Sequence, residues 1–200
     1  MNYYWHTPEG KIIQAVFGAK DAEVLASPLS EQYAFVATED RIPHVSQAYI
    51  DTATGQLVPK GEPLTPKHTW DYPNKSWQDK RSLAQAKAEK AEEITKARAV
   101  ANKDSFTFQG KEIACDPLSR SDIDAISGYV ALMGEMPPNW IGVWKTKDNS
   151  YLAIPNVVVW KQFYTAMVAK GQSNFDKSEQ LKAQITQAAT TAEADAVQWD

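Results

Sequence analysis

The first 58 residues contain short runs of β-favouring residues that are separated by turn residues. Strands are predicted over residues 2–6, 11–17, 33–38, 45–50 and 56–58. Pro8 and Gly10 separate the first two strands, and Gly55 separates the last two. Both residue types favour tight turns, so each pair is expected to form a hairpin. The pattern predicts a small β-rich module over residues 1–58.

A different pattern follows, in which prolines interrupt every regular element. Four of the eleven prolines fall within residues 59–73. Proline has no amide hydrogen and fixes φ, which favours an extended, unpaired chain. Residues 59–79 are therefore predicted to be a linker. Its large aromatic residues, Trp70, Tyr72 and Trp77, are expected to anchor it onto a neighbouring surface.

The clearest predicted helix covers residues 80–104, which are rich in alanine and contain neither glycine nor proline. Asp79 or Ser76 is placed to cap its N-terminus. Only three of its side chains are large and apolar: Leu83, Ile94 and Val100. This face is too thin to form one wall of a large core. We favour an exposed spacer that associates with copies of itself through these three residues; burial within a monomer core is the alternative.

The remaining residues, 105–200, mix short strand patterns with helical ones and predict a compact α+β domain. Hairpins are expected within 106–115 and 143–154. A helix is expected to begin at Pro155 or Asn156 and to stop at Gly171. A further helix over 178–189 and a last turn capped by Thr190 with Glu193 complete the predicted elements.

Between the two hairpins lies a helix that is expected to end at Gly134. Ser119 as N-cap and Asp122 three residues later match a capping box, and Leu118 is placed to form a hydrophobic staple with Ile123. Four apolar residues at helical spacing form the predicted core face: Ile123, Ile126, Val130 and Met133. The whole chain is thus predicted to be α+β: a β-rich N-terminal module, a Pro-rich linker, a long Ala-rich helix and a compact C-terminal domain.

Composition narrows the class of protein. The chain of 200 residues is 43% hydrophobic and 10% aromatic, which is enough apolar surface for folded cores. A net charge of −4 argues against nucleic acid as a partner. No apolar run has the length of a membrane helix and no signal for Sec export is recognised, so no membrane insertion is expected. The single cysteine, Cys115, excludes an internal disulfide and a thiolate metal cage.

Several ordered phrases of the sequence resemble a known family. They are PKHTWDYPNKSWQD, FTFQGKEIACDPLSRSDIDAISGYVALMGEMP, WKTKDNSYLAI, WKQFYTAMVAKGQSNF and a final AVQW. This run, over roughly residues 67–200, is similar to small tail-fibre-associated proteins of tailed bacteriophages, in which a C-terminal domain of uncharacterised function follows a helix and a Trp-containing linker. The phrase YIDTATGQLV extends the likeness weakly toward the N-terminus. The resemblance implies a virion tail component, made in the host bacterial cytoplasm, or a chaperone of fibre assembly. It implies no active-site residues.

The residues themselves offer little catalytic chemistry. The three histidines, His6, His44 and His68, are too far apart for a recognised metal motif, and no phosphate-binding loop is present. Cys115 lies in a strand pattern, where a buried structural role is expected. Asp122 and Asp124 are two apart on a helix and so point to different faces, which suits helix capping better than the paired carboxylates of a glycosidase. We expect no metal, no cofactor and no enzymatic activity; a cell-wall hydrolase is the remote alternative.

Aromatic residues are dense between positions 139 and 164, which favours a core. Trp140 follows Pro137 and Pro138 on a constrained loop, and it is the aromatic residue we expect to contact a partner. Together these features predict an oligomeric adaptor or attachment component of a phage tail, in the fibre or baseplate. It would bind other tail or fibre proteins and copies of itself through Leu83, Ile94, Val100 and Trp140. A tail-fibre assembly chaperone is the alternative.

Overall fold

The structure, a computed structural model, describes all residues from 1 to 200, and it confirms the predicted α+β class. The chain divides into two compact units, Met1–Lys80 and Arg81–Asp200. The structure thus places one boundary, after Lys80, where the sequence predicted boundaries after residues 58, 79 and 104. The predicted linker joins the first unit and the predicted connecting helix joins the second.

The first unit is built on a three-stranded antiparallel sheet of order β2-β1-β3. Its strands are β1 (Asn2–His6), β2 (Ile12–Phe17) and β3 (Ala34–Thr38). The predicted hairpin around Pro8 and Gly10 is confirmed. Gly10 has a φ of +86°, and a Cβ atom there would lie 2.0 Å from the carbonyl oxygen of Ile50, so only glycine fits.

Two short helices of the first unit escaped the sequence analysis: α1 (Asp21–Leu25) and α2 (Leu29–Gln32). They cover one face of the sheet, where Val24 packs with Tyr3 and Trp5. The indole Nε1 of Trp5 donates to the hydroxyl of Ser30 at 3.0 Å. The missed helices therefore cover the aromatic face of the central strand.

The second predicted hairpin is confirmed as β4 (Ala48–Asp51) paired with β5 (Gln56–Pro59). Its first strand begins later than predicted, because Val45–Gln47 forms a turn of 3-10 helix, η1.

The predicted linker over 59–79 is wrong in its second half. β6 (His68–Asp71) and β7 (Ser76–Asp79) form a third hairpin, in which Trp70 lies opposite Trp77. The Trp70 ring lies 5.2 Å from that of Tyr49, and Trp77 Nε1 donates to the carbonyl of Lys60 at 3.0 Å. The expected anchoring role of these aromatic residues is confirmed, and the surface that receives them belongs to the first unit itself.

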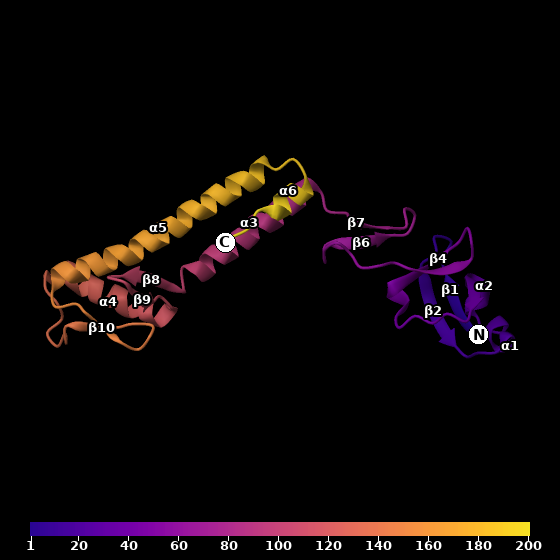
Figure 1. Cartoon of the computed structure of the whole chain (residues 1–200), viewed down its shortest axis with the longest axis horizontal. Coiled ribbons are helices and arrows are strands. Elements are labelled where there is room, and N and C mark those ends of the chain that lie inside the picture. The colour runs from indigo at the N-terminus through magenta and orange to yellow at the C-terminus, as the bar shows by residue number, and fades with distance from the viewer. The chain divides into compact units, whose positions relative to one another are not determined.

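The second unit combines four helices with two small hairpins. The helices are α3 (Leu83–Ala101), α4 (Pro117–Met133), α5 (Val157–Gln187) and α6 (Thr191–Ala196). The hairpins, both expected from the sequence, are β8 (Ser105–Phe108) with β9 (Lys111–Ala114) and β10 (Val143–Lys145) with β11 (Tyr151–Ala153). Figure 1 shows α3 alongside the C-terminal half of α5, while α4 and the hairpins gather at the N-terminal end of α5.

One large core fills that end of α5. It contains ten buried side chains: Phe106, Ile113, Cys115, Ile123, Val130, Leu152, Ile154, Trp160, Phe163 and Met167. The ring of Phe163 lies edge-on to those of Phe106 and Phe108, at 5.1 and 5.6 Å. Cys115 is buried, as expected, and burial raises the pKa of its thiol.

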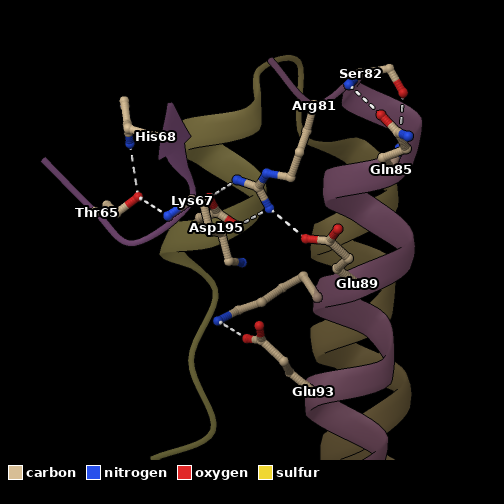
Figure 2. Close-up of polar contacts among 10 residues, drawn as sticks. Thr65, Lys67, His68, Arg81, Ser82, Gln85, Glu89, Glu93 and Asp195 are labelled. Atoms are coloured by element: carbon tan, nitrogen blue, oxygen red, sulfur yellow. Dashed lines mark hydrogen bonds and ion pairs between the residues drawn. The ribbon is translucent and has the colours of Figure 1, made fainter. Parts of the chain in front are cut away.

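The interpretation of residues 80–104 as an exposed spacer is wrong. One face of α3 packs against α5 and α6, and it buries Ala86, Lys90 and Ile94. The alternative, burial within a monomer, therefore holds, because alanines let the helices approach closely enough for a narrow apolar face to suffice. The N-cap is Ser82, not Asp79 or Ser76, and Ser82 forms a capping box with Gln85 (Figure 2).

The start of α4 also differs from the prediction. Its N-cap is Asp116, whose carboxylate accepts from the backbone of Leu118 and Ser119, and Pro117 occupies the first helical position. The N-cap role given to Ser119 is therefore wrong. The predicted C-terminus is confirmed by Gly134, which has a φ of +74°. Of the predicted core face, Ile123 and Val130 are buried, whereas Met133 is exposed.

Helix α5 runs without a break from 157 to 187, so the predicted stop at Gly171 is wrong. Asn156 caps its start, as expected, and Thr190 caps α6. The partner of Glu193 differs, since its carboxylate accepts from the backbone of Ala189. Contacts with α3 extend beyond Gly171 and hold this part of the chain helical.

A polar clamp joins the start of α3 to α6. The guanidinium of Arg81 donates from Nη2 to Asp195 at 2.6 Å and from Nη1 to Glu89 at 2.8 Å (Figure 2). Arg81 is largely buried, which makes this pair stronger than an ordinary surface ion pair. The clamp fixes the C-terminal helix against the first turns of α3.

Candidate binding groove

The second unit has an open groove of about 740 Å³ between α4 and α5. Both helices contribute side chains to it. It is lined by Arg120, Asp124, Ser127, Gly128, Val130, Ala131, Trp160, Lys161, Tyr164 and Thr165. We call it the α4–α5 groove.

The floor of the groove is mainly apolar and is held from below by the core. Trp160, only 1% exposed, donates its indole N–H to the hydroxyl of Ser127 at 3.1 Å. Val130 is also buried. Tyr164 packs on the same core, and its hydroxyl forms no hydrogen bond within the chain. The floor therefore offers one free phenol, able to donate or accept, on an apolar base.

The rim of the groove carries more positive than negative charge. Arg120 and Asp124 form a long ion pair, 4.0 Å between Nε and Oδ2, on an exposed helix face. Such a pair contributes little to stability and leaves the guanidinium accessible. Lys161, on the opposite bank, forms no ion pair within the chain. The groove can therefore receive an apolar side chain together with a nearby carboxylate.

The four residues predicted to bind partners do not come together in the structure. Ile94 is only 2% exposed and belongs to the packed face of α3, so it is not available to a partner. Leu83 is partly buried, and Val100 is exposed. A contact between either residue and a partner stays a prediction.

Trp140 is mainly used inside the second unit. Its indole Nε1 donates to the carbonyl of Ile154 at 2.7 Å, and its ring lies 5.5 Å from that of Trp160. Only part of the side chain is exposed, so these internal contacts account for its place on the Pro-constrained loop. A partner contact by Trp140 also stays a prediction.

The acidic residues considered for catalysis lie in separate settings. Asp124 forms the long ion pair with Arg120, whereas the side chain of Asp122 forms no hydrogen bond or ion pair within the chain. The Lys147–Asn149 turn is confirmed as a turn: Asp148 accepts from the hydroxyls of Thr146 and Ser150, which hold the pKa of its carboxyl well below its usual range. No group of three or more histidine, cysteine or acidic side chains is placed to hold a metal ion.

Sequence reasoning missed the groove because its residues are distant in the chain. Arg120 and Lys161 were not singled out, and nothing in their local sequence distinguishes them from other surface cations. The one available signal was Gly128, a glycine inside a helix, where it is less favourable than alanine by about 1 kcal/mol. In the structure, a Cβ atom added at Gly128 would meet nothing within 4 Å, so no contact within the chain requires a glycine there.

None of the helices is long and apolar enough to cross a bilayer. Comparison with protein families gives one match, to the model described as Domain of unknown function (DUF4376), over residues 85–198. The matched residues include every side chain that lines the α4–α5 groove. Comparisons with curated proteins and with solved structures gave no significant match.

Proposed function

The chain belongs to the DUF4376 family, whose domain covers more than half of its length, and from this premise we propose that it is a non-enzymatic structural protein of a phage tail. In this role it is an adaptor, located in the virion tail, that binds other tail or fibre proteins. It is made in the cytoplasm of the bacterial host. The resemblance of residues 67–200 to tail-fibre-associated proteins supplies the phage context.

The observation that carries the binding role is the α4–α5 groove. Its apolar floor, free phenol and cationic rim are features that a protein segment with an apolar anchor and a carboxylate complements. Trp160 is buried, so it presents no face to solvent on which a sugar ring could stack. We assign the groove to a segment of a neighbouring tail protein.

The division into two units supports the same role. The second unit has the large aromatic core, and the first has two smaller core clusters of its own, around Tyr4 and around Trp5. Each unit can therefore present a separate surface. Several copies arranged by the symmetry of a tail gain effective concentration, so no single contact needs to be tight.

Quantitative mass spectrometry of purified phage particles tests this proposal. We expect the protein in particles at a copy number that is a whole multiple of the tail symmetry. Particles made with Lys161→Glu, which reverses one charge of the rim, should contain at least about tenfold less of it. Lys170→Glu, which changes another exposed lysine of α5 outside the groove, serves as the matched control and should be incorporated normally.

The other outcomes contradict the proposal in distinct ways. Absence from particles, together with loss of soluble fibre when the gene is deleted, would identify an assembly chaperone. Clearing of a suspension of purified peptidoglycan by the isolated protein would identify a cell-wall hydrolase. Equal incorporation of both lysine variants would show that the α4–α5 groove does not bind the protein into the particle.

A further inference from the structure

A second open hollow, of about 580 Å³, lies between the C-terminal end of α3 and the first half of α4. Asn102 and Lys103 line it from the α3 side, and Pro117 and Ser121 line it from α4. We call it the α3–α4 hollow. None of these four residues lines the α4–α5 groove.

The hollow and the α4–α5 groove are neighbours, because Arg120 and Asp124 line both of them. These two residues are four apart on α4 and so share one face of the helix. A molecule that passes over this pair reaches both concave surfaces. We call the groove, the hollow and the Arg120–Asp124 pair between them the α4 band. Leu118 lines neither surface; it is 72% exposed, so the staple predicted for it is wrong.

The α4 band is cationic, although the chain as a whole has a net charge of −4. The side chains that line it include three cations, Lys103, Arg120 and Lys161, and a single carboxylate, that of Asp124. Lys103 is exposed and, like Lys161, forms no ion pair within the chain. Arg120 has only the long contact of 4.0 Å with Asp124. The cations are thus free to meet carboxylates from outside the molecule.

The dimensions of the α4 band set the length of a polypeptide that fills it. A helix with its side chains is about 10 to 12 Å across, and an extended residue spans about 3.3 Å. Crossing α4 therefore takes about four residues. A few more are needed to enter the groove at one end and the hollow at the other, so the segment has about seven residues.

Nucleic acid is also attracted to cations, but the α4 band favours a protein segment. Three cations against one carboxylate allow few phosphate contacts. Trp160 is buried, so its ring is not available to stack on a base. An apolar floor beside separated cations suits a chain that alternates apolar and acidic side chains.

We infer that the α4 band binds an extended, acidic segment of about seven residues from a partner protein, and that this segment crosses α4 over Arg120. One apolar side chain lies on the floor of the α4–α5 groove, and carboxylates meet Lys161, Arg120 and Lys103 in turn. This inference rests on the function proposed for the groove and adds the α3–α4 hollow as a second binding surface. It makes Asp124 the one group in the band that repels the segment.

NMR titration of the isotope-labelled full chain with a synthetic peptide tests the inference. The probe is acetyl-Glu-Leu-Thr-Glu-Val-Thr-Glu-amide, in which successive carboxylates are about 10 Å apart when the chain is extended. Saturable shifts are expected at the amides of Thr165, in the groove, and Ser121, in the hollow. The analogue with glutamine at the three acidic positions should bind at least about tenfold more weakly.

Substitutions separate the hollow from the groove. Lys103→Glu should raise the dissociation constant of the acidic peptide at least about tenfold, because it places a like charge at one end of the segment. Lys145→Glu, which changes an exposed lysine of β10 outside the band, is the matched control and should leave it unchanged. Asp124→Asn should lower it about two- to fivefold, since the only repelling carboxylate is removed. Circular dichroism of each variant distinguishes weaker binding from unfolding.

The results that overturn the inference differ from those that overturn the proposed function. Shifts at Thr165 without shifts at Ser121, or equal binding by the native chain and Lys103→Glu, would confine the partner to the α4–α5 groove and leave the proposed function intact. Shifts at neither position would contradict both. Equal affinity for the glutamine analogue would show that charge does not select the segment. An oligothymidylate that shifts both amides at lower concentration than the peptide would identify nucleic acid as the ligand instead.

Discussion

The two ends of helix α5 are packed in contrasting ways, although one uninterrupted helix connects them. Its N-terminal half buries Trp160, Phe163 and Met167 in the aromatic core, whereas its C-terminal half buries Asn174, Ser178 and Ile185 against α3 and α6. We call these the aromatic end and the seam end of the second unit. Large apolar side chains dominate the first, and small or polar ones dominate the second.

The contrast shows where the stability of the second unit resides. Each buried aromatic side chain removes a large apolar area from water, while buried polar groups contribute only as far as they are hydrogen-bonded. At the seam end, Asn174 Nδ2 donates to Asn102 Oδ1 at 2.7 Å, but the hydroxyl of Ser178 is buried with no partner. The aromatic end therefore fixes the geometry of the α4–α5 groove, and the seam end is held with a smaller margin.

The largest expected effect is at the aromatic end. Phe163→Ala should lower the free energy of unfolding by about 3 to 5 kcal/mol, because it leaves a cavity between Phe106, Phe108 and Trp160. Urea unfolding followed by circular dichroism measures it. A loss below about 1 kcal/mol would mean that the aromatic cluster is not the main stabilising core.

A smaller loss of stability is expected when a buried side chain of the seam end is truncated to alanine in the same way. Ile94→Ala should lower the free energy of unfolding by about 2 to 3 kcal/mol, at the lower end for such substitutions, because small neighbours can close on the cavity. Hydrogen exchange should show that protection falls mainly in α3 and in the C-terminal half of α5. An equal loss of protection around Trp160 would show that the aromatic end and the seam end do not differ in stability.

The polar clamp at the seam end should contribute less to stability than Ile94 does. Arg81→Met should cost about 1 to 2 kcal/mol, since it leaves Asp195 and Glu89 without their shared cation in a partly exposed site. Arg81→Lys keeps the charge and should recover only part of the lost stability, because lysine lacks the planar guanidinium that donates to two carboxylates at once. The thermal midpoint of both variants at low and high salt provides the measurement; no difference between methionine and arginine would show that the clamp is not stabilising.

Removal of a polar group should strengthen the seam end. Ser178→Ala eliminates a buried hydroxyl that has no partner and introduces a better helix former, so we expect a gain of about 1 kcal/mol. Ser173→Ala, an exposed serine of the same helix, controls for helix propensity. If both variants gain equally, the burial of the unpaired hydroxyl is not the cause.

The smallest effect concerns acid stability at the turn between β10 and β11. Hydrogen bonds from Thr146 and Ser150 lower the pKa of Asp148 in the folded state. Because the folded pKa lies below the unfolded value of about 3.9, the carboxylate stabilises the fold above that pH, and the contribution disappears as the pH falls. Asp148→Asn should therefore reduce the loss of stability between roughly pH 5 and pH 2 in urea titrations. If the native chain and Asp148→Asn lose the same free energy of unfolding as the pH falls, the Asp148 carboxylate makes no such contribution.

The sequence was sufficient where one local signal determines an element. Turn residues between strand-favouring runs predicted four hairpins, and Pro155 or Asn156 predicted the start of α5. It failed where two local signals compete. Ser119 and Asp116 both suit an N-cap, and the proline at position 117 decides in favour of Asp116 because it fits the first helical position.

Other errors arose because tertiary contacts override local preference. Gly171 is followed by a chain that packs on α3, so the helix continues through it. Lys90 interrupts the apolar face of α3 in sequence, yet its stem is buried while its amine reaches Glu93 at 2.9 Å. The α4–α5 groove depends on how two helices pack, which no local pattern in either helix reveals.

Site-specific photo-crosslinking in assembled phage particles tests the adaptor role most directly. A photoreactive amino acid at Thr165, on the bank of the α4–α5 groove, should form a covalent link to another tail or fibre protein. The same group at Gln162, which is exposed on α5 but outside the groove, should not. Crosslinking from Gln162 with none from Thr165, or crosslinking from neither position in particles that contain the protein, would contradict the account.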